Sequence, residues 1–455
     1  MLNSPKTSSA PHQHIMQLVT DKLVKRKKEV HAFECSLDAS SGWSLEYLNG
    51  SVKKLEQSST VNLIIKVYQK GSSGYKKGSC VTNLTSSAAL DQAIDQALNS
   101  AHYAECDEAS GLADHAQLAW NYPNLELDFP IKLTPQEATR AAAAAEKTFL
   151  AKDARIKRSS GIEWEAVRAH HYYTNSLGFQ GDYASSYALV SGSLIAADAA
   201  GNMQRDGDFD VASDASRLRS LDDVMNSALK RTLSRLNAAK LTPRRCPVIF
   251  SAEIAPSLLA PFLAAIGGYN IYLGNSFLVD KLDKQVFAPK INLIEQPLLP
   301  ARLGSAPFDD EGVALRERPL VTDGRLEHYL LSSYSARKLK IATGSTGNAG
   351  GVHNLMVQST TSGGLDALLA KVNRGLLVTE LYSGNENILN GDYSCGAFGY
   401  WVENGKIQYP VKELTIAGNL KDMLLNIAMA GDDVDYRHNV CSGSLVVSEM
   451  TVASN

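Results

Sequence analysis

The first part of the chain alternates between helical and strand-like spacing of its hydrophobic residues. Residues 15–28 place apolar side chains three and four positions apart and end in a basic KRKK run, which predicts an amphipathic helix. Residues 31–71 have alternating or continuous apolar positions with Asn49-Gly50 and Gly71 as breaks, which predicts strands and turns. Helical spacing returns over 87–104. The order helix, strands, helix describes an α+β unit.

The same order of elements recurs in the next part of the chain. Thr134-Pro135 predicts a helix start, because threonine caps a helix and proline suits the first helical position. Strand-like alternation follows, with a hairpin turn expected at 175–178, and 221–236 is again amphipathic. We expect similar architecture in the two parts, without a residue-level repeat.

The pattern changes from Pro247 onward. A short buried strand is followed by an apolar helix over Ala255–Ile266, which Gly267-Gly268 ends. The remaining chain is rich in glycine and strands, and Asp323-Gly324 and Asn404-Gly405 predict tight hairpins. This part is expected to be mostly β.

These patterns predict an α+β fold, in which two N-terminal helix-strand-helix α/β units precede a large, mainly antiparallel β C-terminal domain. The expected boundaries are a disordered tail (1–14) and N-terminal helix within 1–30, a first unit over 31–120, a second over 121–240, and the C-terminal domain over 241–455.

Composition narrows the classes of function. The 455 residues carry a net charge of −3, so there is no electrostatic footprint for nonspecific nucleic-acid binding. No apolar run approaches the about 20 residues that span a bilayer, and the first residues lack the apolar core of a secretory signal. The six cysteines form no CxxC pair, so free thiols and a cytoplasmic location are expected.

Standard catalytic motifs are absent from the sequence. It contains no GxSxG, no GxxxxGK[ST] and no HExxH. His170 and His171 would point to opposite faces of a strand and could not ligate one metal together. Asp309-Asp310-Glu311 could bind a divalent cation, although a solvated loop is the commoner outcome for such a cluster.

The segment 390–405 combines four glycines with four aromatic residues. Glycine permits close backbone approach and aromatic side chains supply contact area, so the segment has the composition of a recognition surface. A tightly packed β-meander explains the same pattern equally well.

Three segments carry a family resemblance: GLLVTEL (375–381), NGDYSCGAFGYWVENGKIQYPVKELTIAGNLKDML (390–424) and SAPFDDEGVALRERPLV (305–321). They resemble the TldD/PmbA family, and the resemblance extends over about 30–450.

The resemblance implies that the chain is one of the two types of protein in this family. TldD-type members are cytoplasmic zinc metalloproteases with a His-Glu-x-x-x-His helix and a C-terminal cysteine as third ligand. PmbA-type members, also called TldE, form heterodimers with TldD. The complex is implicated in maturing peptide antibiotics and degrading small antitoxins, and an older name refers to modulation of DNA gyrase.

The residues favour the PmbA/TldE type. The resemblance places the metal motif on the helix at 255–266, but no histidine or cysteine occurs from Pro247 to Glu327, and Glu253 only precedes the helix. Cys441 is near the family's third-ligand position and is expected to be an ordinary thiol without the histidines. We therefore expect no catalytic residue, no metal ligand and no cofactor in this chain. The zinc would be in a TldD-type partner, and a homodimer is an open alternative for the isolated chain.

The implied function is that of a subunit in a cytoplasmic protease complex that cleaves unfolded peptides or small proteins. Two alternatives stay open: a stand-alone peptidase with other chemistry, and a non-enzymatic regulator that binds proteins such as gyrase. We expect segment 390–405 to receive extended peptide by strand addition. The substrate-groove candidates are Asp392, Tyr393, Gly396, Phe398, Gly399, Tyr400 and Cys441. The competing interpretation is that this segment only packs the β core.

Overall fold

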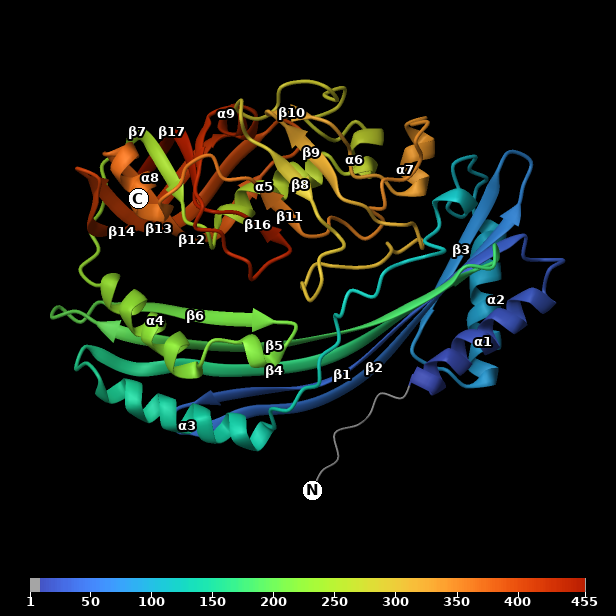
Figure 1. Ribbon diagram of the computed structural model, residues 1–455, viewed down its shortest axis with the longest axis horizontal. Helices are drawn as coiled ribbons and strands as arrows, with labels where there is room; N and C mark the ends of the chain where they lie inside the picture. The colour runs from blue at the N-terminus through green and yellow to red at the C-terminus, as the bar shows by residue number, and fades with distance from the viewer. Residues whose placement is uncertain (1–8, 455) are drawn as a thin grey trace.

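The computed structural model describes residues 9–454 and shows two layers of structure, a long curved sheet and a β-rich C-terminal domain beside it (Figure 1). The fold is α+β, as predicted. No helix among the described residues is both long and apolar enough to cross a membrane. All six cysteines are free thiols.

The two N-terminal units share one antiparallel sheet. Its strand order is β3-β2-β1-β4-β5-β6, so β1 of the first unit pairs directly with β4 of the second. This merging was not predicted. The strands are β1 (Ala32–Leu48), β2 (Ser51–Lys70), β3 (Tyr75–Thr82), β4 (Ile156–Asn175), β5 (Gln180–Ala197) and β6 (Met203–Ala212).

Local sequence signals explain the turns and helix ends of this sheet. Asn49 and Gly50 join β1 to β2 with φ of 53° and 72°, the left-handed values that a two-residue hairpin of this type requires. The predicted turn at 175–178 joins β4 to β5. Thr134 forms a capping box with Glu137 and Pro135 stands in the first turn, as the sequence indicated.

Four helices pack on the sheet in two pairs, and each pair has its own core. The first pair covers β1–β3 with residues such as Leu23 and Ile94, and the second covers β1, β4 and β5 with Phe149 and Val224. The helices are α1 (Ser9–Lys25), α2 (Ser87–Tyr103), α3 (Pro135–Ala151) and α4 (Leu221–Ser234). The prediction of a disordered tail is wrong for residues 9–14, which belong to α1. Residues 1–8 lie outside the described part.

The C-terminal domain is built around a closed sheet. Its order is β14-β13-β12-β7-β17-β15, and pairing of β14 with β17 closes a five-stranded barrel. Most pairs are antiparallel, as predicted, but β7 and β12 are parallel. The strands are β7 (Arg244–Phe250), β12 (Gly375–Glu386), β13 (Asp392–Glu403), β14 (Lys406–Asn419), β15 (Ile427–Ala430) and β17 (Leu445–Ser454).

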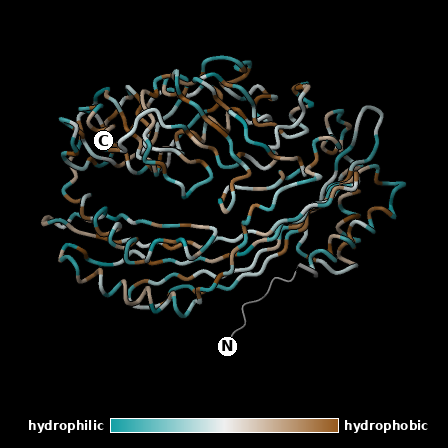
Figure 2. Tube along the Cα trace, in the orientation of Figure 1, coloured by the Kyte–Doolittle hydropathy of each residue, from teal (hydrophilic) through white to brown (hydrophobic). Residues whose placement is uncertain are grey.

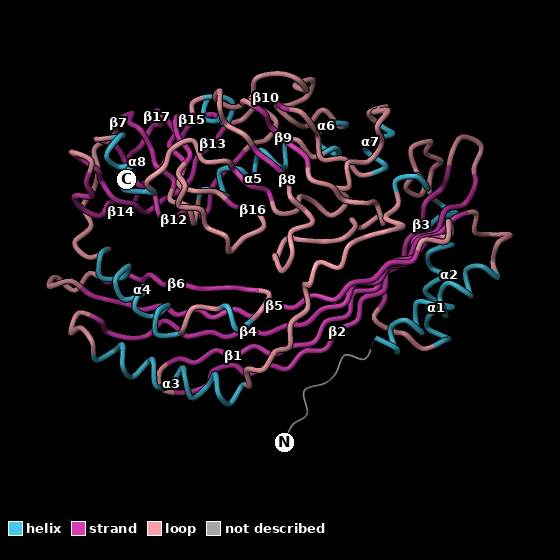
Figure 3. Tube along the Cα trace, in the orientation of Figure 1, coloured by secondary structure: helices cyan, strands magenta, loops and turns pink. Residues whose placement is uncertain are grey.

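A smaller sheet of order β10-β9-β8-β11-β16 lies beside the barrel. Its strands are β8 (Leu293–Glu295), β9 (Arg318–Thr322), β10 (Arg325–Leu326), β11 (Leu355–Val357) and β16 (Val440–Cys441). Long loops connect these short strands (Figure 3). The two predicted hairpins are present: Asp323-Gly324 joins β9 to β10, and Asn404-Gly405 joins β13 to β14.

Five helices complete the C-terminal domain: α5 (Ala255–Ala265), α6 (Gly268–Tyr272), α7 (Ser333–Lys338), α8 (Gly364–Val372) and α9 (Leu420–Leu425). The predicted apolar helix is α5. Its hydrophobic residues enter the largest core of the molecule together with barrel strands. Hydrophobic and hydrophilic positions are interspersed along the coloured part of the trace in Figure 2. The buried hydrophobic residues form several separate cores.

Candidate functional site

Helix α5 occupies the position where the sequence resemblance places a metal motif. Its sequence, APSLLAPFLAA, offers no nitrogen, sulfur or carboxylate side chain. Leu258, Leu259 and Phe262 are buried in the core. No group of three histidine, cysteine or acidic residues that could hold a metal occurs within 9–454. The residues present at this helix therefore do not fit a zinc ion.

Glu253, the acidic residue just before α5, is already engaged. Its carboxylate accepts a hydrogen bond from Arg231 at 2.5 Å, and Arg437 lies 3.6 Å away. This carboxylate is therefore engaged in ion pairs at the contact between the two layers.

Cys441 is a buried thiol at the end of β16. Its Sγ donates to the carbonyl of His438 at 3.1 Å, and the guanidinium of Arg302 donates to it at 3.2 Å. Burial raises the pKa of the Cys441 thiol above its ordinary value, against the opposing effect of Arg302. Because metals bind the thiolate, this environment favours a protonated structural cysteine.

Segment 390–405 lies inside the barrel wall rather than at an open edge. Strand β13 pairs with β12 on one side and β14 on the other. Gly399 is needed for this packing, since a Cβ there would lie 2.1 Å from the carbonyl oxygen of Leu377. The prediction that peptide adds to this strand is wrong, because both of its edges are occupied.

The seven groove candidates are not gathered around one opening. Tyr393, Phe398, Gly399, Tyr400 and Cys441 are buried, and Gly396 is half-buried beside Tyr382. Asp392 is exposed at the start of β13, where it accepts a hydrogen bond from Asn390 at 2.7 Å. Contact of these residues with a substrate stays a prediction.

Phe398 and Tyr400 instead connect the barrel to helix α4. The guanidinium of Arg235, just after α4, lies 3.7 Å from the centre of the Phe398 ring. The hydroxyl of Tyr400 is 2.6 Å from the hydroxyl of Ser234, the last residue of α4. These two aromatic residues therefore fix the contact between the sheet layer and the C-terminal domain.

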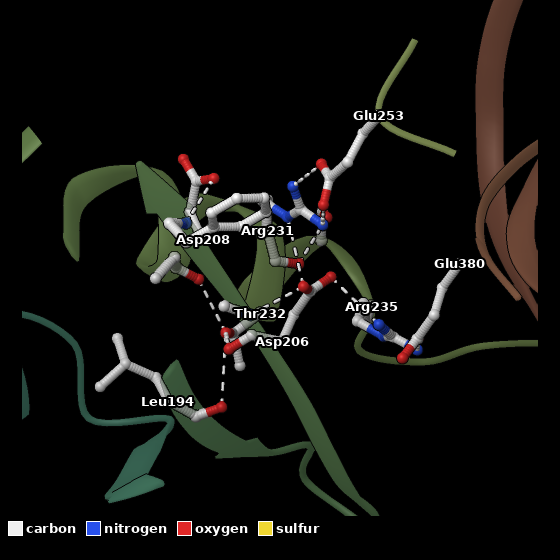
Figure 4. A network of polar contacts seen from close by, with 12 residues as sticks. Leu194, Asp206, Asp208, Arg231, Thr232, Arg235, Glu253 and Glu380 are labelled. Atoms are coloured by element: carbon white, nitrogen blue, oxygen red, sulfur yellow. Dashed lines mark hydrogen bonds and ion pairs between the residues drawn. The ribbon is translucent and has the colours of Figure 1, made fainter. Parts of the chain in front are cut away.

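Around this contact lies a network of arginines and carboxylates (Figure 4). Arg235 binds Asp206 of β6 at 3.1 Å and Glu380 of β12 at 2.5 Å, so it joins the two layers directly. Arg231 joins them a second time, since it binds Asp206 at 3.2 Å and Glu253 at 2.5 Å. Burial disfavours a charged Arg235, but the neighbouring carboxylates outweigh it and raise its pKa. Both arginines are therefore charged at neutral pH.

The same network covers the outer edge of strand β6. The backbone N–H of Gly207 donates to Asp206 at 2.7 Å, and that of Phe209 donates to Asp208 at 2.8 Å. The carbonyl oxygen of Phe209 accepts from Arg219 at 2.6 Å and Arg437 at 2.8 Å. These groups would be free to pair with another strand if the charged side chains did not occupy them.

A polar cavity of about 570 Å³ lies where β6 and the barrel meet. Its lining residues are Gly161, Glu163, Ser191, Gly192, Ser193, Gln204, Arg205, Asp206, Gly207, Asp208, Phe209, Arg235, Glu380 and Tyr382. Within the lining Arg235 pairs with Asp206 and Glu380, whereas Asp208 pairs with Arg219 and Arg437 outside it. The lining includes neither histidine nor cysteine. The cavity is therefore a polar opening between the N-terminal sheet and the barrel.

The remaining sequence candidates are structural. His170 and His171 contact different carboxylates, Asp182 at 2.7 Å and Asp38 at 2.6 Å. The expectation of a solvated loop is wrong for Asp309, which is buried. Its carboxylate accepts the backbone N–H groups of Glu311, Val313 and Ala349. Burial raises the pKa of Asp309 to about 8 in spite of these donors.

Sequence reasoning missed the residues of the arginine–carboxylate network. One signal was available: Asp206, Asp208 and Asp210 alternate within a strand-like segment, which places three carboxylates on one side of a strand. Their arginine partners come from α4, from the residues that flank it, and from Arg437 more than 200 positions later, which no local pattern indicates.

The chain is similar throughout to a set of known proteins. Models of the PmbA/TldA metallopeptidase family match domain 1 over 34–101, the central domain over 129–236 and the C-terminal domain over 243–454. A metalloprotease PmbA homolog of Haemophilus influenzae is 38% identical over 455 residues, which covers 100% of this chain and 99% of that protein. The metalloprotease PmbA of Escherichia coli O157:H7 is 38% identical and covers 92% of both chains.

Two solved structures extend the comparison. One, from Bacteroides thetaiotaomicron and named as a proposed modulator of DNA gyrase, has a TM-score of 0.89 at 26% identity and covers 97% of this chain and 99% of its own. The TldE of Thermococcus kodakarensis has a TM-score of 0.80 at 18% identity, over 96% of this chain and 100% of its own, and shares the fold.

Replacing Phe398 by alanine should lower the free energy of unfolding by about 3–5 kcal/mol, because a buried ring and its stacking with Arg235 are lost. Thermal or urea unfolding measures this. Tyr103→Ala is the control, since that ring is 86% exposed and its loss should change stability by no more than about 0.5 kcal/mol. Equal stability of the two variants would contradict the assignment of Phe398 to the core.

Replacing Arg235 by methionine should destabilise the protein by about 1–3 kcal/mol, because the buried guanidinium loses its hydrogen bonds to Asp206 and Glu380, while water can reach the half-exposed Glu380. Arg245→Met removes an ion pair with Glu449 whose side chains are 70% and 54% exposed, and should cost less than about 1 kcal/mol. Urea titration compares the two variants. A larger loss for Arg245→Met would show that the network does not hold the layers together.

Proposed function

This chain belongs to the PmbA/TldD family of metallopeptidases, and we propose that it is the PmbA/TldE-type subunit of a cytoplasmic protease complex whose TldD-type partner holds the zinc. The complex would cleave unfolded peptides or small proteins, as in the maturation of peptide antibiotics and the degradation of antitoxins. This chain would shape part of the substrate chamber and stabilise the assembly.

The observation that carries the proposal is the composition of α5. A hydrolytic zinc site needs three protein ligands and an open position for water. In this chain the helix at that place is apolar and packed into the core, and the nearby Glu253 is bound by arginine. This supports the proposal that another chain supplies the metal chemistry of the family.

The relatives support a partner of the TldD type. A metalloprotease TldD homolog of Haemophilus influenzae is 26% identical to this chain over 228 residues, which is 45% of this chain and 47% of that protein. A chain of the same family would have a related fold and a related surface for pairing. The name of the Bacteroides structure supports the alternative of a non-enzymatic regulator of gyrase type.

The cavity between β6 and the barrel is the place where this chain would meet a substrate. The side chains of Glu380 and Tyr382 are partly exposed there, and Glu163 lines the opposite wall. A polar cavity of this kind would guide an extended peptide toward the partner's zinc without taking part in the bond cleavage.

Purified alone after metal loading and desalting, the chain should retain no stoichiometric zinc in its C-terminal domain, because α5 offers no ligand. Elemental analysis measures the ratio of zinc to protein, and a TldD-type chain treated in parallel is the control that should keep its metal. One tightly held zinc per chain, lost when residues of this domain are changed, would overturn the proposal.

Cleavage of an unfolded peptide should need both chains. The isolated chain should work no faster than background, and addition of a TldD-type partner should give activity that a chelator abolishes, because the metal lowers the pKa of its bound water to about 7. A partner whose motif glutamate is changed to glutamine is the matched control and should be inactive. Chelator-resistant cleavage by the lone chain would favour a stand-alone peptidase instead.

A further inference from the structure

A second cavity, of about 440 Å³, lies at one end of the barrel and shares no lining residue with the cavity beside β6. Its walls are formed by Pro243, Arg244, Arg245, Cys246, Pro247, Arg374 and Trp401. These residues belong to β7, to β13 and to the positions just before β7 and β12, three strands that lie side by side in the barrel (Figure 1). We call this cavity the arginine pocket.

The unequal starts of neighbouring strands explain why a cavity exists here. β7 already pairs with β17 at Arg244, whereas its pairing with β12 begins only at Val248. β12 itself starts at Gly375. Beside the first residues of β7 there is therefore no β12 strand, and Trp401 of the following strand, β13, lines the gap.

Two of the arginines are held against the ring of Trp401. The Cζ atom of Arg244 lies 4.9 Å from the centre of this ring, and that of Arg374 lies 5.6 Å from it. Trp401 is only 3% exposed and belongs to the main core, so the ring is fixed. A guanidinium that stacks on an aromatic ring keeps its N–H groups available to an acceptor beside the ring. The stacking thus positions two sets of donors before any ligand binds.

The positive charge of the pocket is only partly balanced. Three arginines line it, and no described acidic residue does. Arg244 donates to the carbonyl oxygen of Thr242 at 3.1 Å and to the hydroxyl of the same residue, and it forms no ion pair with a carboxylate of the described residues. Arg374 meets Glu403 through its Nε atom alone, at 3.4 Å, and these side chains are 62% and 46% exposed. Such an exposed pair is weak and leaves the outer nitrogens of Arg374 free for another acceptor.

The thiol of Cys246 does not compensate for this charge. Burial raises the pKa of the thiol to about 11, against the opposing effect of Arg244 and Arg374. The thiol is therefore protonated and neutral at neutral pH. A neutral wall with cationic groups around it calls for an oxyanion, because arginine N–H groups bind the oxygens of phosphate and carboxylate groups in the same forked geometry.

Charge and volume favour the phosphate group of a small organic molecule over a carboxylate. A phosphate monoester carries a charge of about −1.5 to −2 at pH 7 and has three acceptor oxygens, so it can accept from two guanidiniums at once. A carboxylate has a single charge and two oxygens. The volume of about 440 Å³ lies in the range of about 300–1,000 Å³ that is typical of small-molecule sites, which leaves room for an organic group beside the phosphate.

We propose that the arginine pocket binds the phosphate group of a small organic phosphate. Arg244 and Arg374 are its main contacts, and Trp401 holds their guanidiniums in place. The inference does not rest on the proposed function, because the pocket is formed by this chain alone and binding there needs neither zinc nor peptide.

Isothermal titration calorimetry of the full chain with phenyl phosphate at low ionic strength tests the pocket. We expect a Kd below about 1 mM, and weaker binding as salt is added, because salt screens partly exposed charges. Benzoate, which has the same ring but a carboxylate, should bind about 10-fold more weakly or worse. Inorganic phosphate should also bind more weakly than phenyl phosphate, since it leaves the rest of the cavity filled with water.

Arginine variants test the residues. Arg244→Gln and Arg374→Gln should each weaken the binding of phenyl phosphate about 10-fold or more, since each removes a charged donor. Arg217→Gln is the matched control, because it removes the same charge from a side chain that is 66% exposed and lies outside the pocket. It should leave the Kd unchanged within about twofold. Far-ultraviolet circular dichroism checks that each variant is folded.

A wild-type chain that does not bind phenyl phosphate would overturn the proposal. Benzoate binding as tightly as phenyl phosphate would overturn the choice of phosphate, and inorganic phosphate binding as tightly would overturn the place for an organic group. An equal loss in Arg217→Gln would show that only net charge matters. Arg374 is exposed, so Arg374→Gln tests the contact even if Arg244→Gln fails to fold, and an unchanged Kd in it would contradict the proposal.

Discussion

A β-sheet cannot leave the backbone groups of a buried edge unpaired, and this requirement shapes the junction between the two layers of the protein. Strand β6 ends the six-stranded sheet at the side that faces the C-terminal domain. Instead of another strand, aspartates of β6 accept its N–H groups and arginines donate to its carbonyl oxygen. Arg437, one of these two arginines, comes from the C-terminal domain and also binds Asp208 of β6. Arg231 and Arg235 bind Asp206 of the same strand and carboxylates of the C-terminal domain, so the contacts along this edge also fix the domain.

The charged residues of the junction and the apolar residues of helix α5 lie in different parts of the molecule. Arg231, Arg235 and their carboxylates collect at the junction, and Arg235, Asp206 and Glu380 line the cavity there. Helix α5, a short distance along the chain from Glu253, is apolar and has become part of the main core. The chain thus has the fold of a metallopeptidase family, but the helix at which the metal motif is expected packs into the hydrophobic core. This is consistent with a chain that contributes shape and binding to a complex, as we propose.

Local signals predicted much of the secondary structure but not its assembly. Asn49-Gly50, Asp323-Gly324 and the Thr134 capping box gave correct turns and a correct helix start, because their geometry depends on neighbouring residues only. The pairing of β1 with β4 joins residues more than 100 positions apart, and the Arg437–Asp208 contact joins residues 229 positions apart. No periodicity in a short window carries such information.

The glycine- and aromatic-rich segment shows the same limit at the candidate site. Its composition suited an open groove and a packed strand equally well. The deciding fact is that β12 and β14 both pair with β13, and that Phe398 stacks on an arginine from another layer. The apolar character of α5, by contrast, was readable from the sequence, because the absence of ligands depends on residue identity alone.

The central claim is that the metal of this system belongs to the partner chain. Crystals of the complex with a TldD-type chain, measured with X-rays on both sides of the zinc absorption edge, would locate every zinc by its anomalous signal. We expect one zinc site per pair of chains, within the partner, and no signal near residues 255–265 or Cys441 of this chain. A zinc peak inside this chain's C-terminal domain would contradict this claim.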